Sequence, residues 1–97
     1  MRYELESTDA FDVWLSELDG SLKRRLANRL SQVERGNFGD HKPLAENLFE
    51  LRFTFGGGLR VYYSIRERVI VLLLNGGNKA SQKLDIATAK TMLDELE

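Results

Sequence analysis

The sequence has no cysteine and only one histidine, and both scarcities exclude chemistry. Without cysteine, the chain forms no disulfides, no thiolate metal sites and no cysteine nucleophile. The single histidine, His41, cannot build a multi-histidine metal site. We therefore predict a protein that holds no metal and needs no cofactor.

Long apolar runs are also missing, because the longest, residues 69–74, is far too short to cross a membrane. The N-terminus has Arg2 followed by acidic residues, unlike the basic and then apolar pattern of a signal peptide. A chain of 97 residues is large enough for one core and too small for two. We expect a single domain over residues 1–97, in the cytoplasm and without a membrane partner.

The net charge of −1 shows no excess of either sign, but the charges are unevenly distributed. Residues 1–20 hold one arginine and six acidic residues, whereas residues 51–83 hold six basic residues against Glu67 alone. The central block is a candidate anion-binding patch. The alternative, that its basic residues only solvate the open face of a sheet, has equal support from the sequence. The basic residues of 21–36 are interpreted as a solvated helix face rather than an RNA-binding rim.

Residues 49–66 predict a β-hairpin. Large apolar and polar residues alternate over 49–55 and 59–66, and Gly56 to Gly58 supply the turn between them. A turn centred on Gly57 places Thr54 opposite Arg60. One face is then apolar. The other is predicted to be an open cationic and aromatic platform formed by Glu50, Arg52, Thr54, Arg60, Tyr62, Ser64 and Arg66.

The remaining elements complete an α+β domain. We predict a strand at 3–5, helices over 9–18 and 21–35 with Ser21 as the cap of the second, and a loop over 37–47. A strand at 69–74, apolar on both faces, belongs in the interior of the sheet, and a helix follows residues 79–81. The predicted fold is a small, mainly antiparallel sheet packed by an N-terminal helical hairpin, with a C-terminal helix.

Phosphodiester cleavage without metal is the chemistry that this pattern leaves open. Clustered acids for a metal-dependent nuclease are missing, and the glycines at 56–58 are not followed by the lysine of a phosphate-binding loop. RNA cleavage needs an aligned 2′-hydroxyl and cations that stabilise the phosphorane-like transition state. Arg52, Arg60 and Lys79 are the candidate catalytic cations.

Three further residues are candidates for RNA binding: Tyr62, Arg66 and Lys83. A tyrosine can stack on a base or donate to a phosphate. Arginine is a poor proton acceptor, so the general base is Lys79 with a lowered pKa, Glu50, or absent. A free histidine side chain can act as an acid or a base near neutral pH. No partner for such chemistry is visible around His41, however, and we interpret it as an exposed loop residue.

Six short segments carry a resemblance to a known family: residues 36–44 (GNFGDHKPL), 50–52 (ELR), 59–63 (LRVYY), 73–82 (LLNGGNKASQ), 85–86 (DI) and 89–90 (AK). Together they resemble the HigB-like, phage Gp49-like branch of the RelE/ParE toxin superfamily, often called addiction-module killer proteins. The resemblance spans nearly the whole chain. It implies a small sheet with an N-terminal helical hairpin, in agreement with the fold predicted from the residues.

The resemblance also implies a type II toxin that a cognate antitoxin, often a helix-turn-helix protein, inactivates. RelE-like and HigB-like toxins cut mRNA on the ribosome without metal, whereas ParE-like toxins inhibit DNA gyrase. By position, Arg60 matches the strand arginine of the RNases, Arg52 a basic residue on the preceding strand, and Lys79 a transition-state arginine. Asp85 lies near the position of the usual C-terminal tyrosine, and Glu50 replaces a second basic residue.

The leading hypothesis is therefore a toxin that acts as a ribosome-dependent mRNA endoribonuclease, an mRNA interferase, and blocks translation. Its partners would be the antitoxin, the ribosome and mRNA. The alternatives are a gyrase inhibitor and a catalytically inactive toxin-fold protein that only binds its antitoxin.

Overall fold

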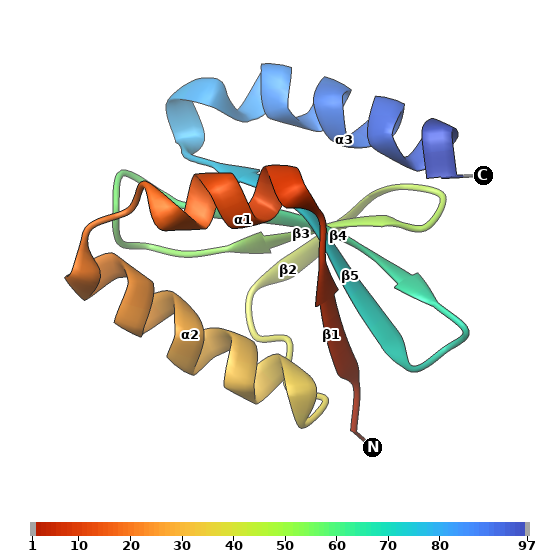
Figure 1. The fold of residues 1–97 in the computed structure, drawn as a ribbon, viewed down its shortest axis with the longest axis horizontal. Coiled ribbons are helices and arrows are strands. Elements are labelled where there is room, and N and C mark those ends of the chain that lie inside the picture. Colours follow the sequence, from red (N-terminus) through yellow and green to blue (C-terminus); the bar gives the residue numbers. More distant parts are fainter. Residues whose placement is uncertain (1, 97) are drawn as a thin grey trace.

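The computed structural model describes residues 2–96, which form a five-stranded sheet with helices on both faces (Figure 1). The strands are β1 (Glu4–Ser7), β2 (His41–Ala45), β3 (Leu48–Arg52), β4 (Arg60–Arg66) and β5 (Ile70–Gly77). The helices are α1 (Asp9–Ser16), α2 (Gly20–Glu34) and α3 (Gln82–Leu96), with a 3₁₀ turn, η1 (Lys79–Ser81), before α3.

The strand order is β1-β5-β4-β3-β2, in which β1 runs parallel to β5 and the other pairs are antiparallel. Helices α1 and α2 pack on one face, and α3 packs on the other. The predicted α+β fold, with its helical hairpin, mainly antiparallel sheet and C-terminal helix, is confirmed. The prediction that strand 69–74 is interior is also confirmed, because β5 lies between β1 and β4.

The two N-terminal helices begin at side-chain caps. Thr8 accepts a hydrogen bond from the amide of Phe11 at 3.1 Å, and Asp19 accepts one from the amide of Leu22 at 2.9 Å. These bonds satisfy amides that the first turn of a helix leaves unpaired. The predicted cap of the second helix, Ser21, is wrong by two residues, because Asp19 takes that place.

The larger core lies between the helical hairpin and the sheet. It contains Phe11, Leu26, Leu30, Val33, Leu51, Phe53, Leu59, Val61, Tyr63, Val71 and Leu73. The predicted apolar face of the β3–β4 hairpin supplies many of these side chains. The hairpin loop is further held by α2, where the guanidinium of Arg25 lies 3.9 Å from the ring centre of Phe55.

The opposite face of the β3–β4 hairpin is covered by α3, so the predicted open platform is wrong. A second core forms there from Leu48, Tyr62, Leu72, Leu74, Ala89 and Leu93. Glu50, Tyr62 and Ser64, expected on the open platform, are each 0% exposed. Leu72 and Leu74 point to this side of β5, so the face has enough apolar area to hold a helix.

The register of the hairpin is shifted by two residues from the prediction. Arg52 lies directly opposite Arg60, and Glu50 lies opposite Tyr62. The strand β3 ends at Arg52, and residues 53–59 form a wider loop in which all three glycines have positive φ. A shift of two keeps every side chain on its predicted face. It brings the two arginines beside each other.

The predicted loop over 37–47 contains a strand, β2, which is a correction. The strand pairs antiparallel with β3 at the edge of the sheet, where Lys42 lies opposite Glu50. Pro43 made this segment unlike a strand, but an edge strand tolerates proline because one side of its backbone needs no partner.

The turn between β4 and β5 holds Glu67 and Arg68 at φ values of 52° and 66°. Two central residues with positive φ define a type I′ turn, which favours glycine at its second position. We expect Arg68→Gly to raise the free energy of unfolding by about 1 kcal/mol, because it removes left-handed strain. Urea unfolding measures this. The control is Lys90→Gly on the exposed side of α3, which should lower the free energy of unfolding by about 1 kcal/mol. A loss of stability in both variants would contradict the prediction.

Candidate cationic site

Arg52, Arg60 and Lys79 come together at one end of the sheet. Arg52 ends β3 and lies opposite Arg60, the first residue of β4, and Arg60 in turn lies opposite Gly77 at the end of β5. Lys79 follows two residues later in η1. We call these three residues the cationic site. The structure thus places the three predicted residues at neighbouring positions at one end of the sheet.

The glycine loop between β3 and β4 packs against η1, the 3₁₀ turn that carries Lys79. A Cβ atom built on Gly58 would lie 3.4 Å from Lys79 Cβ and 3.9 Å from Arg60 Nη1. The amide of Lys79 donates to the carbonyl of Gly57 at 3.4 Å. Arg60 and Lys79 therefore flank the same glycine, and a residue with a side chain there would enter the space between them.

Arg52 is the more accessible arginine of the site, with a side chain 37% exposed. Its Nη2 lies 3.1 Å from Asp40 Oδ1, and its Nε lies 3.3 Å from the same oxygen. A pair this exposed contributes little to stability. The guanidinium of Arg52 can therefore exchange Asp40 for a phosphate at small cost.

Arg60 is more enclosed, with a side chain only 13% exposed, and its Nε lies 3.9 Å from Glu50 Oε2. Glu50 is buried and accepts a hydrogen bond from Gln82 Nε2 at 2.8 Å. Gln82 is the first residue of α3. The strand arginine is thus connected through a buried carboxylate to the helix that covers this face.

Tyr62 lies beneath α3 and cannot stack on a base in this arrangement. Burial raises the pKa of its phenol well above the ordinary value, and the nearby carboxylates of Glu50 and Asp85 raise it further. The phenol therefore stays neutral across the physiological range. The expectation of an exposed stacking tyrosine does not hold for this conformation.

Arg66 and Lys83, the other two RNA-binding candidates, lie apart from each other. Arg66 ends β4, six residues from Arg60, which is about 20 Å along an extended strand. It lines a separate open hollow together with Glu6 and Glu67. Lys83 is exposed in the first turn of α3, one residue after Gln82. The structure leaves Arg66 outside the cationic site and places Lys83 on the helix that borders it.

The sequence did not predict the layer of polar residues that lies under α3. Asn75 Nδ2 donates to the backbone carbonyl of Asp85 at 3.0 Å, and Ser81 Oγ donates to Asp85 Oδ2 at 2.5 Å. Several buried polar atoms of this layer make no hydrogen bond: Glu50 Oε1, Arg60 Nε, Tyr62 Oη, Ser64 Oγ and Asn75 Oδ1. Unpaired buried polar atoms are costly and often mark functional regions.

Two other features of residues 2–96 bear on the type of site. No group of three or more acidic or histidine side chains is arranged to hold a metal ion within these residues. Among the same residues, no helix has the length and apolar character to span a membrane.

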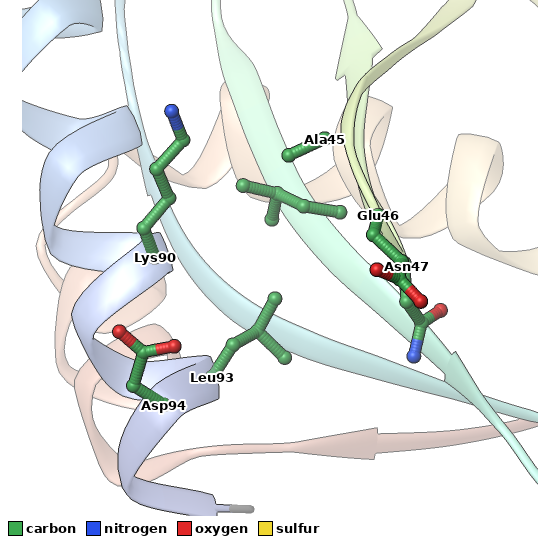
Figure 2. Close-up of a pocket in the computed structure, with 7 residues that line it drawn as sticks. Ala45, Glu46, Asn47, Lys90, Leu93 and Asp94 are labelled. Atoms are coloured by element: carbon green, nitrogen blue, oxygen red, sulfur yellow. The ribbon is translucent and has the colours of Figure 1, made fainter.

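A groove of about 570 Å³ lies away from the cationic site, between the β2–β3 turn and the C-terminal half of α3 (Figure 2). Leu48 and Leu93 supply apolar lining. Glu46, Lys90 and Asp94 stand along its rims. It has no cluster of cations for an RNA backbone. We therefore base the functional argument on the cationic site.

Two solved structures that share this fold come from RelE toxin systems. The free E. coli RelE double mutant matches with a TM-score of 0.70 at 19% identity, over 88% of this chain and 93% of that chain. A chain of the RelBE2 toxin–antitoxin complex from Mycobacterium tuberculosis matches with a TM-score of 0.67 at 19% identity, over 81% of this chain and 100% of that chain. The fold is therefore that of the RelE toxins.

The sequence comparisons give the family. The model of the family described as "Phage derived protein Gp49-like" matches residues 13–97, and the chain belongs to this family. An uncharacterized protein of Haemophilus influenzae is 40% identical over 97 residues, which is 99% of this chain and 98% of that protein. The recognition of a Gp49-like protein is confirmed by the family match, and the expected RelE-like fold is confirmed by the solved structures.

Proposed function

We propose that this protein is the toxin of a type II toxin–antitoxin system and cleaves mRNA on the ribosome without a metal ion, which blocks translation. The observation that supports this most is the convergence of Arg52, Arg60 and Lys79 at one end of a sheet with the RelE fold. Three cations at one end of the sheet suit a phosphate whose negative charge increases in the transition state.

In the proposed reaction, the 2′-hydroxyl of a nucleotide attacks the adjacent phosphorus and the 5′-oxygen of the next nucleotide leaves. The products are a 2′,3′-cyclic phosphate and a 5′-hydroxyl end. Arg52 and Arg60 cannot act as the base, because a guanidinium does not give up its proton near neutral pH. Their role is to bind the phosphate and stabilise its charge. The exposed Lys79 adds a third cation from η1.

The proposed partner is a cognate antitoxin in the cytoplasm, of the helix-turn-helix class that the family resemblance implies. An E. coli RelE mutant is solved in complex with an antitoxin peptide, and the same kind of pairing is proposed for this chain. The antitoxin would cover the cationic site with acidic residues or displace α3, since the block 51–83 holds six basic residues against one acid.

A second candidate function is binding of the antitoxin without catalysis. It is favoured by the enclosure of Arg60 and Tyr62 beneath α3, where Arg60 is 13% and Tyr62 is 0% exposed. In that case the cationic site would be an antitoxin-binding surface only.

Induced expression without antitoxin tests the proposal. We expect incorporation of labelled amino acids to stop within minutes, while DNA synthesis continues at first and an abundant translated mRNA appears cleaved on a northern blot. Co-expression of the antitoxin should restore translation. Intact mRNA together with a DNA-damage response would show gyrase inhibition instead, and normal growth at high expression would support the binding-only function.

A further inference from the structure

We infer that Glu50 is a positioning residue that holds the guanidinium of Arg60 in the orientation needed to meet a phosphate. The catalytic part of this inference rests on the proposed function. The positioning itself is a property of the folded chain and can be measured without any RNA.

The register places the two side chains within reach of each other. Arg52 lies opposite Arg60, so Glu50, two residues before Arg52 on the same face of β3, is the diagonal neighbour of Arg60. Diagonal neighbours on antiparallel strands are close enough for long side chains to meet. Glu50 Oε2 accordingly lies 3.9 Å from Arg60 Nε, and the carboxylate is almost completely buried.

The contact selects one direction for the guanidinium. Nε faces inward to Glu50, whereas Nη1 lies 3.9 Å from a Cβ built on Gly58, on the side where Lys79 packs. Nη1 is thus directed toward the side on which Lys79 lies. An arginine side chain has many rotamers, and fixing it beforehand removes an entropy cost that the substrate would otherwise bear.

Glu50 is itself held from the other side. Gln82 Nε2 donates to Glu50 Oε2 at 2.8 Å, and Gln82 begins α3. The same oxygen therefore faces both Gln82 and Arg60. The other oxygen, Oε1, has no hydrogen-bond partner. Arg60 is the cation beside this buried carboxylate, and removal of one partner of such a pair leaves a buried charge without compensation.

The test uses Glu50→Gln, which removes the charge and keeps the size. In spectra of ¹⁵N-labelled protein, the Nε–Hε signal of Arg60, assigned by its loss in Arg60→Lys, should shift and exchange faster with water. The Nε–Hε signal of Arg52 should stay in place, because Arg52 pairs with Asp40. An Arg60 signal that is unchanged in Glu50→Gln would overturn the inference.

The kinetic arm uses mRNA cleavage on programmed ribosomes. We expect Glu50→Gln to lower kcat about a hundredfold with KM nearly unchanged, the usual cost of a misplaced catalytic group. In an Arg60→Ala background, the same substitution should have no further effect. An equal loss in both backgrounds would show a structural role and refute the inference. The neutral control is Asp94→Asn on the distant groove.

Two further results keep the inference separate from the proposed function. If the wild-type protein cleaves no RNA, the proposed nuclease fails, and the Arg60 signal still decides whether Glu50 positions the arginine. If Glu50→Gln does not fold, Gln82→Ala replaces it, since this variant removes only the contact that holds Glu50. It should shift the Arg60 signal in the same direction by a smaller amount, and no shift would refute the inference.

Discussion

Replacement of Arg60 with alanine is expected to lower the rate of mRNA cleavage on programmed ribosomes about 100- to 1000-fold. This is the usual cost of removing one group that stabilises transition-state charge. Among the three cations, Arg60 is the most enclosed, because its side chain is only 13% exposed and lies beside the buried Glu50. Single-turnover cleavage, with the labelled mRNA resolved on a gel, measures the rate.

The matched control for this variant is Arg35→Ala, which removes an exposed arginine from the end of α2. It should cleave at the wild-type rate. Circular dichroism should show that Arg60→Ala keeps the fold, although the loss leaves Glu50 without its charged neighbour and lowers the melting temperature. A folded Arg60→Ala protein with full activity would show that this arginine is not part of the reaction.

Replacement of Gly76 with alanine is expected to lower the free energy of unfolding by about 3 kcal/mol, at the upper end of the cost of overpacking a core. A Cβ on Gly76 would lie 2.5 Å from Cε3 and from Cζ3 of Trp14. Real Cβ atoms do not approach a ring so closely, so α1 would have to move away from β5. Urea unfolding followed by circular dichroism measures the loss.

A double mutant separates this clash from a general effect of alanine. Because Trp14→Ala removes the ring, the two substitutions together should cost less than the sum of their separate costs. The control is Gly57→Ala, where a Cβ meets nothing within 4 Å and only the φ of 73° opposes it. It should cost about 1 kcal/mol. Additive costs at Gly76 and Trp14 would contradict the packing described here.

The β3–β4 hairpin shows which features the sequence could predict and which it could not. Alternation over 49–66 correctly assigned the side chains to two faces, but three consecutive glycines permit several loop lengths, and the true register differs by two residues. The covering of the second face by α3 was missed because Glu50, Tyr62 and Ser64 resemble a solvent-exposed face. Leu72 and Leu74 carried the contrary signal, since a strand that is apolar on both faces needs cover on both.

The candidate site was predictable as a set of residues but not as an arrangement. The spacing of Arg52, Arg60 and Lys79 along neighbouring elements indicated one end of the sheet, which is where they lie. The contact between Glu50 and Gln82 joins residues 32 positions apart and depends on how α3 packs. No local pattern encodes such a contact, so the support of Arg60 by a buried carboxylate emerged only from the structure.

Mapping of RNA 5′ ends across the transcriptome, after induction of the wild-type chain and of Arg60→Ala, tests the central claim most directly. The account predicts new 5′-hydroxyl ends inside translated reading frames for the wild-type protein and their absence for Arg60→Ala. No new ends in either strain, or the same ends in both, would contradict an RNA-cleaving site built around Arg60.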